Sequence, residues 1–130
     1  MVAHRAAVSR RARERRRRED RVHGQNGGRR LDADRLGREL GERATLVQFS
    51  TAFCAPCRAT RRVLDEVAGM VPGVVHVEID AEKHLDLVRD LEVESTPTVL
   101  VLDASGRVVR RAAGQPRRVD VIAALGEAVG

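Results

Sequence analysis

The sequence predicts a three-layer α/β/α sandwich built on a four-stranded mixed sheet. Short apolar runs typical of buried strands alternate along the chain with segments whose apolar residues recur at helical spacing. Strand–helix–strand units favour parallel pairing through a right-handed crossover. The turn residues at 103–106 join the last two strand patterns as an antiparallel hairpin, so the sheet is expected to be mixed.

The first predicted element is a short helix. Asp32 or Asp34 can cap its N-terminus through a side-chain carboxylate, and the pattern extends to Glu42. Leu36 and Leu40 lie four residues apart, so both are expected to face the core.

A buried strand and a longer helix follow, with the chain's two cysteines between them. The strand is the compact apolar run at 44–49, and the helix is expected over 58–68, with Gly69 as its stop. A turn at 72–73 comes next. The inward face of this helix is predicted to carry Val63, Leu64 and Val67.

The second half of the chain repeats these two periodicities. A proline before a strand is tolerated at its first residue, and a polar last strand is typical of a sheet edge. The expected elements are a strand at 74–79, a helix at 82–91 with Leu85, Val88 and Leu91 inward, a strand at 99–102, an edge strand at 107–111, and a final helix opened by Pro116 with Val119, Ile122, Ala123 and Val129 inward.

Charge divides the chain into a tail, residues 1–30, and a single domain, residues 31–130. The tail contains eleven Arg and three acidic residues, whereas the domain contains 13 basic and 16 acidic residues. The self-repelling Arg runs and the glycine-rich segment at 24–28 predict that the tail is disordered. Three interpretations of it stay open: charge-driven binding to nucleic acid or an anionic surface, a transit peptide, and a solvated extension without function.

Composition excludes several classes of function for the domain. The chain has no Trp or Tyr on which bases could stack, so no specific nucleic-acid partner is expected. No apolar run approaches the 18 residues of a membrane span, and no apolar segment follows the basic start as it would in a signal peptide. We therefore expect a cytoplasmic protein without a membrane partner.

Both cysteines belong to one motif, Cys54-Ala55-Pro56-Cys57, at the junction of a strand and a helix. Residues three apart share a helix face, so the two sulfurs can bond. The unpaired N–H groups at a helix N-terminus stabilise a thiolate. Pro56 suits the first turn, which needs no N–H donor there. This pattern indicates a redox-active pair.

Two other interpretations of the cysteines stay open. Zinc requires four ligands, and only His76 and His84 could complete a set. Seven residues separate these histidines, outside the usual spacing of zinc ligands, so no metal is expected. Alternatively, both cysteines pack in the core as small apolar residues.

The motif, the order of elements and a later Thr-Pro together resemble the thioredoxin family over about residues 33–129. In that family a Cys-x-x-Cys begins the helix after a central strand, and a cis-proline lies opposite it. Cys54, Pro56, Cys57, Thr96 and Pro97 occupy the corresponding positions. The resemblance implies the thioredoxin-like fold, although the family's first strand is short or missing here.

The chain departs from the family's pattern around the motif. The usual Trp before the first cysteine is Phe53, and the usual Gly-Pro is Ala55-Pro56. The family's buried Asp, which is thought to help deprotonate the second cysteine, is replaced by Gln48, which cannot accept a proton. The family's lysine partner falls at His76, which either transfers protons instead or is an ordinary strand histidine.

The resemblance implies a thiol–disulfide oxidoreductase of the protein-disulfide reductase type, acting in electron transport and cell redox homeostasis. Cys54 would attack and Cys57 would resolve, with substrate-binding or supporting roles for Phe53, Pro56, Thr96 and Pro97. Expected partners are protein disulfides and an electron donor of the thioredoxin-reductase type, with no cofactor and a monomeric state. The alternative is a thioredoxin-like redox sensor or binding module without general reductase activity.

Overall fold

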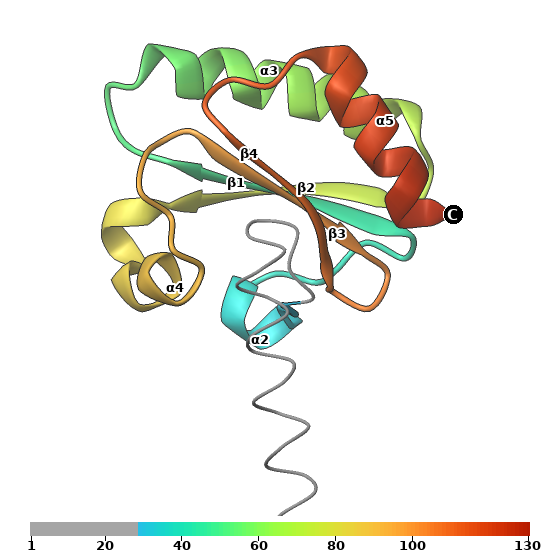
Figure 1. Cartoon of the computed structure of the whole chain (residues 1–130), viewed down its shortest axis with the longest axis horizontal. Helices are drawn as coiled ribbons and strands as arrows, with labels where there is room; N and C mark the ends of the chain where they lie inside the picture. Colours follow the sequence, from blue (N-terminus) through green and yellow to red (C-terminus); the bar gives the residue numbers. More distant parts are fainter. Residues whose placement is uncertain (1–28) are drawn as a thin grey trace, which may run out of the picture.

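The computed structural model describes residues 29–130. The predicted Arg-rich tail lies outside the described residues, except for Arg29 and Arg30. A four-stranded sheet forms the middle layer, with strand order β2-β1-β3-β4 and helices on both faces (Figure 1). In chain order the elements are α2 Ala33–Leu36, β1 Ala44–Ser50, α3 Ala55–Met70, β2 Val74–Asp80, the 3₁₀ turn η2 Ala81–Lys83, α4 Leu85–Asp90, β3 Thr98–Asp103, β4 Val108–Ala113 and α5 Arg118–Val129.

The strand directions confirm the predicted mixed sheet and thioredoxin-like fold. β1 pairs in parallel with β2, with Ala44 opposite Val74, and antiparallel with β3, with Phe49 opposite Thr98. β3 and β4 form the predicted antiparallel hairpin. All seven residues of β1 are buried, since this strand lies between two neighbours and under helices on both faces. The segment that follows β1 therefore begins at the centre of the sheet.

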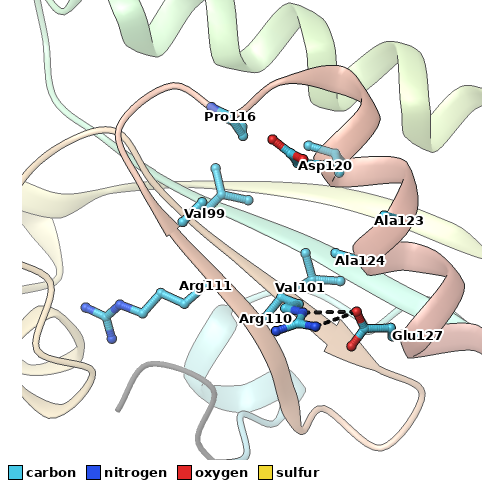
Figure 2. Close-up of a pocket in the computed structure, with 11 residues that line it drawn as sticks. Val99, Val101, Arg110, Arg111, Pro116, Asp120, Ala123, Ala124 and Glu127 are labelled. Carbon is cyan, nitrogen blue, oxygen red and sulfur yellow. Dashed lines mark hydrogen bonds and ion pairs between the residues drawn. The ribbon is translucent and has the colours of Figure 1, made fainter. Parts of the chain in front are cut away.

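Helices α3 and α5 cover one face of the sheet. Leu64 and Val67 of α3 pack with Val121 and Leu125 of α5 in one buried cluster. A pocket of about 290 Å³ remains between α5 and β4 (Figure 2). The ion pair of Arg110 with Glu127 spans it, and none of its lining residues belongs to the cysteine motif.

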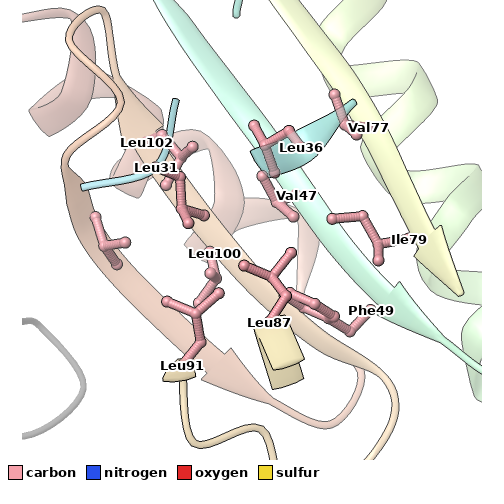
Figure 3. Packing of buried hydrophobic residues seen from close by; sticks show 11 residues of the cluster. Leu31, Leu36, Val47, Phe49, Val77, Ile79, Leu87, Leu91, Leu100 and Leu102 are labelled. Atoms are coloured by element: carbon pink, nitrogen blue, oxygen red, sulfur yellow. The ribbon is translucent and has the colours of Figure 1, made fainter. Parts of the chain in front are cut away.

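The opposite face is covered by α2, α4 and the segment that precedes α2. Alternate residues of the two central strands point into this cluster, among them Val47, Phe49 and Leu100 (Figure 3). Leu31 and Leu87 close it from outside the sheet. The polar residues of β1 are Thr45, whose hydroxyl accepts from Gly41 N–H, and Gln48 and Ser50, which lie on the other face of the strand.

An isolated antiparallel β-bridge lies at the start of the described residues. Arg30 pairs with Arg107 beside β4, and Leu31 N–H donates to the Gly106 carbonyl at 2.8 Å. Gly106 has φ +86°, and a Cβ there would lie 2.0 Å from the Leu31 carbonyl oxygen. Glycine is required at this turn for both reasons. No further strand precedes β1 within residues 29–130, which agrees with the expected short or missing first strand.

The predicted ends of the first two helices are wrong. α2 stops at Leu36 rather than Glu42, because Gly37 adopts the left-handed conformation, with φ +71°, and caps the helix. Its start is as predicted, since the Asp32 carboxylate accepts from Arg35 N–H. In contrast, α3 continues through Gly69 to Met70, because Gly69 keeps a helical backbone and does not cap.

The helix predicted at 82–91 is also divided. His84, with φ −135° and ψ 53°, separates η2 from α4. The interruption changes which side chains face the core, so Leu87 and Leu91 are buried while Leu85 is 55% exposed. Helical spacing counted across the break therefore placed Leu85 wrongly.

The final helix begins after Arg117 rather than at Pro116. Its buried residues are Val121, Ala124 and Leu125, whereas Val119 and Ile122 are 62% and 44% exposed. The predicted inward face, which also included Ala123, is therefore wrong apart from the partly buried Val129. The sequence offers apolar residues on both sides of this helix, and packing against β3 selects one side.

Replacement of Thr60 by valine is expected to stabilise the domain by about 1 kcal/mol, since it removes a buried hydroxyl that lacks a hydrogen bond. Thr60 is fully buried on α3, and its Oγ1 has no partner among the described residues. Thr98→Val is the matched control, because the buried Thr98 hydroxyl donates to the Ser95 carbonyl at 2.6 Å. Urea unfolding should show opposite signs for the two variants, and a loss of stability in Thr60→Val would contradict the prediction.

Candidate active site

The cysteine motif lies after β1, at the N-terminus of α3. Cys54 is the N-cap residue, and its Sγ accepts a hydrogen bond from Cys57 N–H at 3.2 Å. Pro56 lies in the first turn, where its missing N–H costs nothing. The positive end of α3 therefore points at the Cys54 sulfur, which favours its thiolate form.

The two cysteines differ in exposure. Cys54 is partly exposed, whereas Cys57 is only 1% exposed. They are joined by a disulfide, with their Cα atoms 5.2 Å apart, within the usual range for this bond. A reacting molecule would thus reach the sulfur of Cys54 before that of Cys57.

The Thr-Pro segment lies beside the motif although it is some 40 residues away in sequence. The Thr96–Pro97 bond is cis, as the resemblance implied. The Thr96 hydroxyl is 3.0 Å from that of Thr51, in the turn that leads into the motif. The Pro97 carbonyl accepts from Gly114 N–H at 2.8 Å, which ties this loop to the end of β4. Thr96 is thus placed against the turn that precedes the cysteines, and the roles of Thr96 and Pro97 stay predictions.

Phe53 is the most exposed large apolar side chain described. It is 100% exposed and has φ +59°, a conformation that residues other than glycine rarely adopt. It immediately precedes Cys54, so its ring flanks the reactive end of α3. An apolar ring held in solvent at this place is suited to contact a partner.

His76 does not contact either sulfur. Its Nε2 lies 3.0 Å from Gln48 Oε1, and its Nδ1 lies 2.6 Å from an Asp65 carboxylate oxygen. The amide nitrogen of Gln48 donates to the Cys57 carbonyl at 2.8 Å and to the Ser50 hydroxyl at 2.9 Å. The amide therefore stands between the imidazole and the motif.

Sequence reasoning missed Ser50 and Asp65, although two patterns in the chain would have indicated them. Residues 48 and 50 share one face of β1, as residues 76 and 78 share one face of β2. Residues 61 and 65 are four apart on the helix that covers this face. Together these spacings place a polar patch beneath the first half of α3.

Arg61 and Glu78 complete this patch with a bidentate ion pair, both of whose N–O distances are 2.7 Å. The hydrogen bonds from Arg61 hold the pKa of the Glu78 carboxyl below its ordinary value, against the opposing effect of partial burial. The same bonds raise the pKa of Arg61. The pair fastens α3 to the edge strand β2.

Glu78→Gln is expected to destabilise the protein by up to about 1 kcal/mol at pH 7. Because the folded-state pKa of Glu78 is lowered, its contribution is present above the unfolded pKa and is lost as the pH falls through the folded one. The difference from the natural protein should thus begin to shrink near the ordinary Glu pKa of about 4.3 and vanish only below the lowered folded-state pKa. Urea unfolding at several pH values checks this. Glu82→Gln, which removes no described ion pair, should show no such difference, and a Glu78→Gln effect that persists at low pH would contradict the prediction.

Within residues 29–130, no three His, Cys, Asp or Glu side chains gather as metal ligands. None of the helices in that part of the chain has the length and apolar character that crossing a membrane requires. The described site consists of a cysteine pair, joined as a disulfide, at a helix N-terminus, an adjoining cis-proline loop and a buried polar patch. This combination defines a redox protein of the α/β sandwich class.

Comparison with known proteins agrees with this class. The thioredoxin family model matches residues 33–127, and the chain belongs to the thioredoxin family. A thioredoxin of Mycolicibacterium smegmatis is 30% identical over 87 residues, which cover 65% of this chain and 77% of that protein. The structure of thioredoxin NaTrxh from Nicotiana alata superposes with a TM-score of 0.61 at 22% identity, covering 68% of this chain and 76% of that one.

Other curated relatives match over a smaller part of their length. Putative thioredoxin H10 of Arabidopsis thaliana is 33% identical over 57 residues, which cover 44% of this chain and 37% of that protein. Family membership and the cysteine pair are consistent with a thiol–disulfide oxidoreductase. The redox-active pair at Cys54 and Cys57 is thus supported by both sequence and structure.

Proposed function

We propose that this protein reduces disulfides of other proteins through a dithiol–disulfide cycle of Cys54 and Cys57. The observation that carries the proposal is the hydrogen bond from Cys57 N–H to the sulfur of Cys54 at the N-terminus of α3. That N–H and the helix dipole favour a thiolate at Cys54, and the thiolate is the nucleophile in disulfide exchange. The near-complete burial of Cys57 suits it to the second, intramolecular step.

The cycle has two exchange steps. The Cys54 thiolate attacks one sulfur of the substrate disulfide, which forms a mixed disulfide and releases the other substrate sulfur as a thiolate. The Cys57 thiolate then attacks the Cys54 sulfur and releases the second substrate thiolate. Two electrons pass to the substrate, Cys54 and Cys57 end as a disulfide, and a reducing partner must restore the dithiol.

The surroundings of the motif support recognition of an extended protein segment. The backbone next to Pro97 is proposed to pair with the substrate in the manner of an added strand. Phe53 offers an exposed apolar contact, Pro56 lies between the two cysteines in the first turn of α3, and Thr96 contacts the turn that leads into the motif. We further propose an electron donor of the thioredoxin-reductase type, a cytoplasmic location and a monomeric state.

The first experiment is to measure the reduction potential of the Cys54–Cys57 pair against glutathione buffers, by thiol labelling and intact mass. A potential near or below that of the cytosolic glutathione pool is expected for a reductase. A clearly more oxidising value would replace the reductase with an oxidase or isomerase. A protein that formed no reversible disulfide would overturn the redox function altogether.

A redox sensor or binding module is the second candidate. The observation that favours it is Gln48, a buried amide with hydrogen bonds to Cys57 and Ser50, where family members carry an ionisable carboxyl group. Such a protein would cycle between dithiol and disulfide but would turn over general protein disulfides slowly. A reducing potential combined with no turnover of protein disulfides would favour this candidate.

A further inference from the structure

A line of hydrogen-bonded polar side chains runs from solvent to the backbone of Cys57. The 62% exposed carboxylate of Asp65 contacts His76, whose side chain is only 7% exposed. His76 contacts the fully buried Gln48, and Gln48 donates to the Cys57 carbonyl. A histidine and a glutamine buried between α3 and the sheet are thus connected to the cysteine that resolves the mixed disulfide.

The direction of each hydrogen bond follows from the groups at the two ends. The Cys57 carbonyl can only accept, so the nitrogen of Gln48 faces it and the Gln48 oxygen faces His76. His76 must therefore carry a hydrogen on Nε2. An ionised carboxylate also only accepts, so the contact with Asp65 requires a hydrogen on Nδ1. With Asp65 ionised, the ring is a doubly protonated imidazolium.

We infer that His76 is a positioning residue for the resolving step: as an imidazolium it orients the Gln48 amide against Cys57 and places a buried positive charge between α3 and the sheet. This inference rests on the proposed dithiol cycle. It assigns His76 no proton exchange with either sulfur, because both ring nitrogens are occupied and an amide separates the ring from Cys57. The charge favours the Cys57 thiolate, which performs the second exchange.

Two ion pairs join α3 to β2 at His76: Asp65 pairs with His76 itself, and Arg61 pairs with Glu78. Asp65 and Arg61 face it from α3, Glu78 lies two residues along β2, and β1 contributes only the neutral Gln48. Arg61 holds Glu78 as a carboxylate, and the charge of His76 adds a smaller effect in lowering the pKa of Glu78. Since Arg61 and Glu78 offset each other, the buried charge of this patch is that of His76, whose partner Asp65 is 62% exposed.

The test follows the two exchange steps separately with a symmetric aromatic disulfide whose released thiolate is coloured. The Cys54 thiolate of the reduced full-length protein attacks the probe and releases one aromatic thiolate, at a rate proportional to probe concentration. The Cys57 thiolate then attacks the Cys54 sulfur and releases the second, at a rate independent of probe concentration. The dithiol loses two electrons to the probe, and its two thiol protons pass to the solvent. Stopped-flow absorbance between pH 5.5 and 9 resolves both phases.

In His76→Gln, the second phase is expected to be roughly threefold to tenfold slower than in the natural protein, because the Gln48 amide loses its charged partner. The first phase should change little, because Cys54 Sγ takes its hydrogen bond from a backbone N–H. His84→Gln is the matched control, since the ring of His84 has its one described hydrogen bond with the Asp80 carbonyl, and the variant should match the natural protein in both phases.

Asp65→Asn provides a second variant at an exposed position, where folding is not at risk. The loss of its carboxylate removes the acceptor that faces His76 Nδ1, so the second phase should slow in this variant as well. An unchanged second phase in His76→Gln, or in Asp65→Asn, would overturn the inference alone. A natural protein with no second phase at all would overturn the proposed dithiol cycle as well.

Discussion

Cys54→Ser is expected to abolish protein-disulfide reduction, leaving only the background rate of the reductant. A serine hydroxyl at the α3 N-terminus can still accept the hydrogen bond from Cys57 N–H, so the fold of the first turn should persist. It cannot supply the thiolate that attacks a disulfide sulfur. Cys57 cannot substitute for it, because its side chain is buried. Reduction of a protein substrate by a small dithiol, with and without the variant, measures the loss.

Cys57→Ser should behave differently although it is also inactive in turnover. Cys54 can still attack, but nothing displaces it from the substrate, so mixed disulfides should accumulate. Intact-mass analysis after mixing with a protein disulfide would detect them, and Cys54→Ser is the matched negative control. Equal trapping by both variants, or by neither, would refute the assignment of Cys54 as nucleophile and Cys57 as resolving residue.

The sheet and its connections were predictable because strand patterns and turn residues act locally. Residues 44–49 are apolar almost throughout and became the central strand, and Gly106 closes the hairpin that the turn sequence indicated. Helix ends were less predictable, since a glycine can either cap or continue a helix. Gly37 adopts a positive φ and ends α2, whereas Gly69 remains within α3. The sequence alone does not distinguish these cases.

The reactive part of the site was predictable from sequence, whereas its buried support was not. Cys54 and Cys57 lie in one short motif, so spacing and a helix start indicated their chemistry. The contacts of His76 with Gln48 and Asp65 join β2 to β1 and α3, and they depend on register and on which face each strand presents. Such contacts become visible only when the sheet is assembled.

Substitution by alanine is expected to lower the stability of the protein strongly at Phe49 and hardly at all at Phe53. Phe49 is fully buried in the cluster beneath α2 and α4, in β1 at the centre of the sheet (Figure 3). Phe49→Ala removes the ring's contacts and leaves a cavity, which costs about 3–5 kcal/mol. Since a domain of this kind is stable by only about 5–15 kcal/mol, this is the largest effect on stability that we expect from a single substitution here.

Phe53→Ala is the matched control, since Phe53 is fully exposed and alanine would adopt the same positive φ. Its free energy of unfolding should stay within about 0.5 kcal/mol of the natural value. Thermal unfolding followed by circular dichroism should place the midpoint of Phe49→Ala roughly 12 °C or more below that of Phe53→Ala. Similar midpoints would mean that the ring of Phe49 is not packed in the core. A decrease in Phe53→Ala alone would mean instead that the ring beside Cys54 packs on the protein, so that it could not serve as an exposed contact for a substrate.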